Sequence, residues 1–335
     1  MNAKTPRRST KTTMKAVVQD TYGSADVLHV AEIAKPVAGP DDVLVRVRAA
    51  GMDQGVWHFM AGLPYIFRPV AGLRAPKNRV RGYDLAGVVE TVGEKVIAFR
   101  PGDEVLGTAD GSYAEFARAR PDRLAEKPPN VTFEKAAAVP ISGCAALQAV
   151  RDHGNVQPGQ RVLIIGAGGG VGTFAVQISK VDGAEVTGVC STAKTDFVRS
   201  IGADRVIDYT REDFADGRNR YDVILDIAGN RSLAHLRRAL APAGTLVIVG
   251  GEGGGKWFGG IDRQLRASVL SLFVGQKLGT FVSKQRKEDL DTLRELLEVG
   301  KVTPVVDRTF SLSEAAEAIR YLREGRPRGK VVITV

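Results

Sequence analysis

The segment that most constrains the fold of this chain is RVLIIGAGGGVG at residues 161–172, which has five glycines among its last seven residues. Its apolar run predicts a buried strand, and the glycines predict a tight turn into a helix. In the spacing Ala167-x-Gly169-x-x-Gly172, Gly169 would let the backbone approach a pyrophosphate, and Gly172 would let the helix pack against the strand. Free N–H groups at the start of a helix attract phosphate. The segment therefore predicts a dinucleotide site, with a plain strand-turn-helix corner as the alternative.

The pattern of apolar residues divides the chain into two parts. Up to about Ala119 it indicates strands joined by the turns Gly-Pro-Asp and Pro-Gly-Asp, as in a mostly antiparallel β module. The strands expected there are Met14–Gln19, Val43–Ala49 and Ala86–Val92. From about Val139 strands alternate with helices, which predicts a parallel, doubly wound sheet because consecutive parallel strands need crossover helices. The fold class expected is α/β.

The elements of the second part can be placed from the same pattern. We expect strands at Arg161–Ile165, Ala184–Cys190, Arg205–Asp208, Tyr221–Asp226 and Thr245–Val249, and helices at Val171–Val181, Lys194–Ile201 and Arg231–Ala239. After Ser283 we expect a helix at Lys287–Glu298, a strand at Val302–Phe310, a helix at Ser313–Arg323 and a strand at Lys330–Val335. From composition alone, these last elements could extend the parallel sheet or return to the first part.

The strand that follows the glycine-rich turn ends without an acidic residue. A site for NAD usually places Asp or Glu on the adenosine ribose about twenty residues past the last motif glycine. Here Ser191 and Thr192 offer hydroxyls and Lys194 a cation, which suit the 2′-phosphate of NADP. Lys194 could instead be a solvated helix-start residue, and Tyr209 could flank the adenine or cap the sheet. We expect NADPH rather than NADH.

Two later strand ends carry small residues that would face the same crevice, because ligands of open α/β sheets bind at the carboxyl edge of the strands. An ordinary strand-ending turn is the alternative at each of them. The cofactor-binding residues expected are Ala167, Gly168, Gly169, Gly170, Val171, Gly172, Ser191, Thr192, Lys194, Tyr209, Ala228, Gly229, Val249, Gly250 and Gly251.

Composition excludes several classes of protein. The net charge of +9 is partly due to a basic segment before Met14, and the other cations are dispersed among 38 acids, so nucleic-acid binding is not expected. No apolar run reaches the roughly 20 residues that span a bilayer, so no membrane partner is expected. The only two cysteines, Cys144 and Cys190, exclude a disulfide framework. We expect a disordered tail at residues 1–13 and a cytoplasmic protein.

Taken together, collinear motifs make this chain similar to the medium-chain dehydrogenase/reductase superfamily, in its zinc-free quinone oxidoreductase and enone reductase branch. The matching stretches are Met14-Lys-Ala-Val-Val, Ala49-Ala-Gly-Met-Asp53, Arg81-Gly-Tyr-Asp-Leu-Ala-Gly-Val-Val89, Arg100-Pro-Gly-Asp-Glu-Val105, Gly111-Ser-Tyr-Ala-Glu-Phe116, Val139-Pro140, Ala167–Gly172, Ile201-Gly-Ala-Asp204 and Gly329-Lys-Val-Val332. They run in family order over nearly the whole chain from Met14.

The resemblance implies a GroES-like β-rich catalytic domain at 14–138, a Rossmann NADP-binding domain at 139–275, and a segment at 276–335 that returns to the catalytic domain. It implies NADPH in the cleft between the two domains. It also implies a homo-oligomer, a dimer or a tetramer, commonly built through the edges of the Rossmann sheets.

The metal ligands of zinc-dependent members have no counterpart here. Those members carry Cys where Asp53 lies, a Gly-His-Glu motif where Gly82-Tyr83-Asp84 lies, and a third ligand near Ile141. Asp53, Tyr83 and Ile141 do not form a zinc site, which needs three Cys, His or carboxylate ligands. We therefore expect no zinc and no other metal.

Without a metal, reduction of a simple ketone lacks a Lewis acid for the oxyanion, whereas quinones and α,β-unsaturated carbonyls spread the charge. We expect hydride transfer from NADPH to such a small conjugated acceptor. The alternatives are a metal-free carbonyl reductase similar to alcohol dehydrogenases and a non-catalytic relative that only binds the cofactor.

The segment around His58 offers candidate catalytic groups. His58 could donate a proton or anchor a carbonyl, or it could be a packing residue beside Trp57 and Phe59. Asp53 could contact substrate or the nicotinamide ribose, or cap a turn, and Tyr83 is a second donor candidate or a core tyrosine. The aromatic residues expected at an acceptor pocket are Trp57, Phe59, Tyr65 and Trp257, each of which could equally belong to the core.

Overall fold

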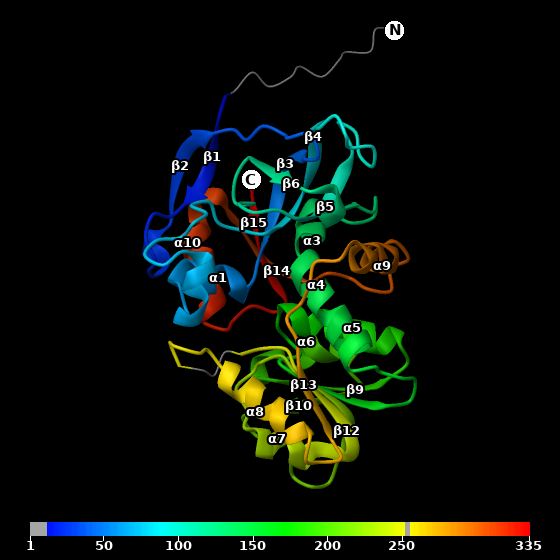
Figure 1. Ribbon diagram of the computed structural model, residues 1–335. Helices are drawn as coiled ribbons and strands as arrows, with labels where there is room; N and C mark the ends of the chain where they lie inside the picture. The colour runs from blue at the N-terminus through cyan, green and yellow to red at the C-terminus, as the bar shows by residue number, and fades with distance from the viewer. Residues whose placement is uncertain (1–11, 252–254) are drawn as a thin grey trace.

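The computed structural model describes residues 12–251 and 255–335, in which a β-rich part and an α/β part stack end to end (Figure 1). The strands of the β-rich part are β1 (Thr13–Val18), β2 (His29–Ala34), β3 (Val43–Met52), β4 (Asp84–Val92), β5 (Glu104–Thr108), β6 (Phe116–Ala119), β7 (Leu124–Glu126), β14 (Val306–Ser311) and β15 (Lys330–Thr334). Its helices are α1 (Gln54–Ala61), α2 (Arg68–Ala71), α3 (Phe133–Ala137), α10 (Ala315–Arg323) and the 3-10 turns Ala25–Val27, Tyr65–Phe67, Pro121–Arg123 and Leu312–Glu314.

Most strands of this part form one sheet in the order β14-β15-β3-β4-β5-β7, with β6 also paired to β3. The pairs are antiparallel except for β14 with β15, and β1 and β2 form a separate antiparallel pair. Residues 1–11 of the expected disordered tail lie outside the described residues. Thr13, which the sequence assigned to that tail, instead belongs to β1 and pairs with Ala34.

The α/β part contains a six-stranded parallel sheet in the order β10-β9-β8-β11-β12-β13. Its strands are β8 (Arg161–Ile165), β9 (Glu185–Cys190), β10 (Arg205–Asp208), β11 (Tyr221–Asp226), β12 (Leu240–Ile248) and β13 (Lys277–Thr280). Its helices are α4 (Pro140–Leu147), a π-helical turn (Gln148–His153), α5 (Gly170–Val181), a 3-10 turn (Thr192–Lys194), α6 (Thr195–Ser200), α7 (Leu233–Ala239), α8 (Ile261–Ser271) and α9 (Lys287–Glu298). The prediction of a parallel, doubly wound sheet is confirmed.

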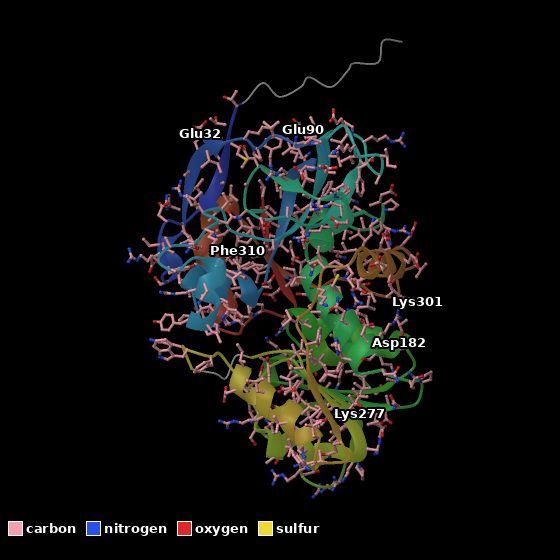
Figure 2. All side chains as sticks on the ribbon, viewed as in Figure 1. Glu32, Glu90, Asp182, Lys277, Lys301 and Phe310 are labelled. Atoms are coloured by element: carbon pink, nitrogen blue, oxygen red, sulfur yellow. The ribbon has the colours of Figure 1, made fainter. Side chains whose placement is uncertain are left out.

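Two features after residue 260 complete the fold, and the family resemblance implied the second of them. Helix α8 and strand β13 extend the parallel sheet past residue 275, and we propose that the boundary of this domain lies after Thr280. The last two strands return to the β-rich part, where Val331 of β15 pairs with Met52 of β3. Phe310 of β14 lies inside this part (Figure 2).

One hydrophobic core crosses the junction of the two parts. It joins Ala49 and Leu106 of the β-rich sheet to Phe174 of α5 and Leu293 of α9. Helix α4 carries the junction, because it is buried along nearly its whole length and packs on α5. The two walls of the space between the sheets are therefore held by shared packing.

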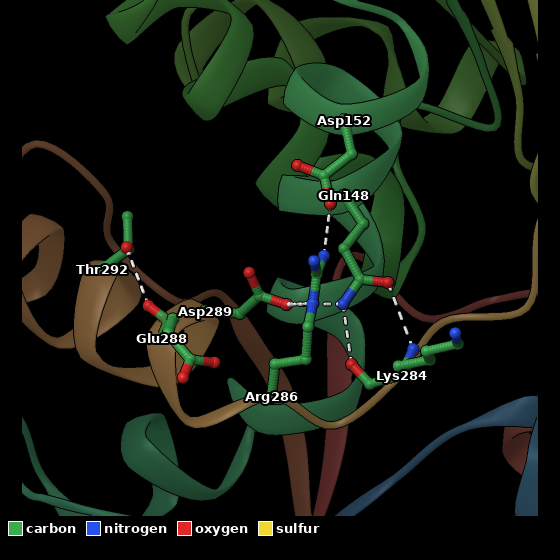
Figure 3. A network of polar contacts seen from close by, with 7 residues as sticks. All are labelled: Gln148, Asp152, Lys284, Arg286, Glu288, Asp289 and Thr292. Atoms are coloured by element: carbon green, nitrogen blue, oxygen red, sulfur yellow. Dashed lines mark hydrogen bonds and ion pairs between the residues drawn. The ribbon is translucent and has the colours of Figure 1, made fainter.

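A polar network fixes the connection into α9 (Figure 3). The buried Gln148 donates to Asp289 over 2.6 Å and to the carbonyl of Lys284 over 2.7 Å. Arg286 donates to Asp289 over 2.9 Å and also pairs with Asp152. The segment between the parallel sheet and the final strands is thus tied to the π-helical turn.

Within the described ranges, no helix has the length and apolar composition that crossing a bilayer requires.

Candidate active site

A cleft of about 650 Å³ lies where the carboxyl ends of the parallel strands face the β-rich part. Many residues that the sequence proposed for the site line it: Asp53, His58, Gly168, Gly169, Gly170, Val171, Ser191, Lys194, Tyr209, Ala228, Val249, Gly250 and Gly251. Of the others, Ala167, Gly172 and Gly229 are buried behind the lining. Residues from both parts of the chain therefore meet in one place.

The wall on the parallel-sheet side is made mainly of backbone. Gly169 immediately precedes α5, so the first N–H groups of this helix face the cleft. A Cβ atom on Gly172 would lie 2.1 Å from the carbonyl oxygen of Gly166, and one on Gly250 would lie 2.0 Å from that of Ile227. Only glycine permits these close approaches, and the resulting cradle fits a pyrophosphate.

Lys194 closes the far end of this wall. Its ammonium donates to the carbonyls of Gly325 and Pro327 over 2.9 and 2.6 Å, and burial lowers the pKa of Lys194. An ammonium has three donors, so one of them remains for a ligand. Ser191 lines the cleft beside it.

Thr192 does not line the cleft, because its hydroxyl donates to Asp208 over 2.5 Å. Asp208 ends β10, the strand next to β9, and no sequence pattern pointed to its carboxylate at this end of the cleft. The hydroxyl of Thr210 also donates to Asp208, over 2.8 Å, and Arg211 lies 3.6 Å from it. These contacts lower the pKa of Asp208, with the hydrogen bond from Thr192 as the main cause.

Asp53 and His58 come from the start and middle of α1. Oδ1 of Asp53 accepts from the N–H of Val56 over 3.2 Å and caps the helix. Its Oδ2 is buried and has no hydrogen-bond partner among the described residues. An unpaired buried carboxylate oxygen is costly, and a hydroxyl donor in the cleft would satisfy it. Nδ1 of His58 lies 3.1 Å from the carbonyl of Leu63.

A buried ion pair that the sequence did not single out lies at the floor of the cleft. Lys330 of β15 lines the cleft and its Nζ is 3.1 Å from Oδ2 of Asp84, with both side chains almost completely buried. Oδ1 of Asp84 accepts from the N–H of Ile141 over 2.8 Å. Burial raises the pKa of Asp84 to about 6, and the ammonium of Lys330 opposes that rise. Both residues belong to the motif stretches given above, which is the signal that could have pointed to them.

The structure places Tyr83 and the expected aromatic residues away from the cleft lining. The ring of Tyr83 packs 5.6 Å from that of Phe59, and burial raises the pKa of Tyr83. Trp57 lies against the guanidinium of Arg323, at 3.7 Å. Trp57 and Tyr83 pack against the core of the β-rich part, so the core alternative describes their positions, whereas Phe59 is exposed. Tyr65 and Trp257 instead contact each other at the surface, 5.1 Å apart, where the two parts of the chain meet.

The three positions compared with zinc ligands do not converge as a donor set. Tyr83 points away from the cleft, and Ile141 contributes only its backbone N–H, which Asp84 accepts. Among the residues that the structure describes, no group of three or more His, Cys, Asp or Glu side chains could hold a metal ion. The residues present therefore do not fit a catalytic zinc.

Comparison with known proteins gives the same architecture. The model of the alcohol dehydrogenase GroES-like domain matches residues 39–129, and that of the zinc-binding dehydrogenase domain matches residues 201–333. The 2-methylene-furan-3-one reductase of Solanum lycopersicum is 34% identical over 96% of this chain and 79% of its own length. The chloroplastic NADPH-dependent alkenal/one oxidoreductase of Arabidopsis thaliana is 33% identical over the same shares.

A solved structure, the quinone oxidoreductase from Coxiella burnetii, superposes with a TM-score of 0.83 at 27% identity over 96% of this chain and 99% of that one. The β-rich part is accordingly a GroES-like domain and the parallel sheet a Rossmann-like domain. The chain belongs to the medium-chain dehydrogenase/reductase superfamily, in the branch of the quinone and enone oxidoreductases, and is an NAD(P)H-dependent oxidoreductase.

Proposed function

We propose that the protein uses NADPH to reduce a conjugated acceptor, a quinone or an α,β-unsaturated carbonyl, without a metal ion. The observation that carries this proposal is the pairing of a glycine cradle that fits a pyrophosphate with a catalytic position whose residues do not fit zinc. The names of the two plant relatives, a furanone reductase and an alkenal/one oxidoreductase, support the choice of acceptor.

The chemistry of the acceptor follows from the groups in the cleft. The bound nicotinamide supplies the hydride. In a simple ketone the resulting charge stays on one oxygen and needs a Lewis acid or preorganised donors worth about 3 kcal/mol each. In a conjugated acceptor the charge spreads over an enolate or a hydroquinone anion. A conjugated acceptor therefore requires fewer preorganised donors in the cleft than a simple ketone does.

Asp53 and His58 are the side chains that we assign to the reacting end. Oδ2 of Asp53 would accept a hydrogen bond from a hydroxyl of the nicotinamide ribose or of the substrate, which fits its lack of a partner. His58 would anchor the carbonyl or deliver a proton to the reduced acceptor, because an imidazole can both donate and accept a proton. Both residues line the same cleft as the glycine cradle.

The preference for NADPH rests on Ser191 and Lys194. They line the end of the cleft that follows β9, where no acid stands on that strand to bind a 2′-hydroxyl. The nearby carboxylate of Asp208 is engaged by Thr192, Thr210 and Arg211, so its charge is compensated.

Turnover by the purified protein tests this function. NADPH and NADH oxidation should be measured against quinones, enones and simple ketones before and after treatment with EDTA. We expect conjugated acceptors to be reduced faster with NADPH and the rates to be indifferent to EDTA. Ketone or alcohol turnover that EDTA abolishes would contradict the metal-free mechanism. Tight NADPH binding without turnover of any acceptor would favour a cofactor-binding role.

Assembly and location remain predictions of the family resemblance and of the composition. We propose a homodimer or a homotetramer, which sedimentation velocity would distinguish. We propose a cytoplasmic location, although the Arabidopsis relative is chloroplastic. Fluorescence microscopy of a tagged chain in its own cell would test this.

A further inference from the structure

We propose that Arg231 is a second cationic contact, beside Lys194, for the 2′-phosphate of the dinucleotide; this inference rests on the NADPH preference proposed above. Arg231 lies in the loop between β11 and α7 and lines the cleft together with Ser191, Lys194 and Tyr209. It stands two residues beyond the strand-end pair Ala228-Gly229, outside the positions that strand-end reasoning selects.

The side chain of Arg231 crosses the adenosine end of the cleft. Its guanidinium carbon lies 5.6 Å from the centroid of the Tyr209 ring, within the range of a cation–π contact. Tyr209 follows β10 and Arg231 follows β11, and strands β9 and β8 lie between these two in the sheet. The contact therefore passes over the ends of the two strands that carry Ser191 and the glycine-rich turn.

A buried ion pair fixes the loop that carries Arg231. Nη1 of Arg263 donates to the carbonyl of Arg231 over 2.8 Å and to Oδ2 of Asp226 over 2.6 Å. Asp226 is fully buried, and its Oδ1 accepts from the N–H of Gly229 over 3.1 Å. These contacts restrain the backbone of the loop, so less conformational entropy is lost there when a ligand binds.

The guanidinium of Arg231 forms no direct salt bridge in the described chain, and its electrostatic interaction with the buried Asp226 is a minor one. Its Nε is buried without a hydrogen bond, whereas the neighbouring Asp226 is paired with Arg263 and Asp208 with Arg211. A phosphate is a suitable ligand for these unused donors, because the planar guanidinium can donate two parallel hydrogen bonds to two phosphate oxygens. Arg231 and Lys194 would then approach the phosphate from two different strands.

Binding of two small probes tests the assignment without turnover. Dissociation constants of adenosine 2′,5′-bisphosphate and 5′-AMP should be measured by calorimetry for the wild type, Arg231→Leu, Arg231→Lys, Lys194→Ala and a control, Arg218→Leu. Arg218 is an exposed cation of the same domain, 86% accessible and paired only with Asp216. The control therefore removes the same charge far from the cleft lining.

We expect Arg231→Leu to weaken the bisphosphate by about 10- to 100-fold while 5′-AMP binding stays unchanged, since one charge-assisted contact is lost. Arg231→Lys should keep part of the discrimination, Lys194→Ala should lose it, and Arg218→Leu should keep all of it. Unchanged 5′-AMP binding also shows that the variant is folded.

Two results would overturn the assignment. Equal weakening of both probes by Arg231→Leu would show that the residue only packs on the adenosine, and unchanged binding of both would show no contact at all. If the wild type itself binds the two probes equally, the proposed NADPH preference fails. If the wild type discriminates and Arg231→Leu does so equally well, only the role of Arg231 fails.

Discussion

The two walls of the cleft are built by different means. The Rossmann-like wall is mostly backbone from a few short segments, and its shape depends on the absence of side chains at Gly172 and Gly250. The GroES-like wall is made of side chains, and its floor joins Asp84 to Lys330, which are 246 positions apart in the sequence. The first wall should therefore be damaged by added volume and the second by a lost charge partner.

The largest effect expected is on the floor of the side-chain wall. Lys330→Met leaves the buried carboxylate of Asp84 without its counter-charge and should lower the free energy of unfolding at pH 7 by about 3–5 kcal/mol. Combining it with Asp84→Asn should restore much of that loss, since the neutral amide needs no counter-charge. Urea unfolding of the two single variants and the double variant measures this. If Lys330→Met alone lowers the free energy of unfolding by less than about 1 kcal/mol, the ion pair is hydrated. The contrast between the two walls would then be weaker.

Added volume tests the backbone wall. Gly172→Ala places a methyl group 2.1 Å from the carbonyl oxygen of Gly166 and should lower the free energy of unfolding by about 1–3 kcal/mol. It should also weaken NADPH binding by displacing the start of α5. Gly279→Ala is the matched control, because a Cβ there meets no atom within 4 Å. If both variants unfold at the same urea concentration, close packing does not shape this wall.

The titration of Asp84 gives a further contrast, of at most about 2 kcal/mol once its coupling to Lys330 is considered. Its folded pKa of about 6 lies above the ordinary value of 3.8, so the folded state holds the proton more tightly. This contribution to the free energy of unfolding is present at pH 4 and is lost as the pH rises through 6. Unfolding free energies of the wild type and the Asp84→Asn/Lys330→Met variant should be compared between pH 4 and 7. We expect the unfolding free energy of the wild type, minus that of the variant, to fall as the pH rises. A value that increases with pH would contradict the raised pKa of Asp84.

The smallest effect on stability is expected at Asp53. Asp53→Asn keeps an N-cap acceptor for Val56, so the free energy of unfolding should change by less than about 0.5 kcal/mol. The unpaired Oδ2 position loses its charge, so kcat/KM for a conjugated acceptor should fall by about tenfold. Asp53→Ala, which removes the cap as well, should cost about 1 kcal/mol of stability in addition. An Asn variant with full activity would remove Asp53 from the reacting end.

Features of the two walls that depend on neighbouring residues could be predicted from the sequence. Contacts between residues far apart along the chain could not. The α/β class and the parallel sheet were predicted and are confirmed, because strand, turn and helix signals are local. The contact between Asp84 and Lys330 was not predicted: the resemblance implied that the last segment returns to the catalytic domain, but no local pattern sets the register of β15 beside β3. The carboxylate of Asp208 was missed for the same reason: it comes from a strand paired with β9, not from β9 itself.

The position of Lys330 near the end of the chain also affects the order in which the two domains can be completed during translation. A ribosome adds about 5–20 residues per second, so Lys330, which comes 246 positions after Asp84, is added on the order of tens of seconds later. During that interval β3 has no β15 at its edge and Asp84 has no counter-charge. The GroES-like domain, although translated first, is therefore completed last, and until then its open strand edge is available for pairing with other chains.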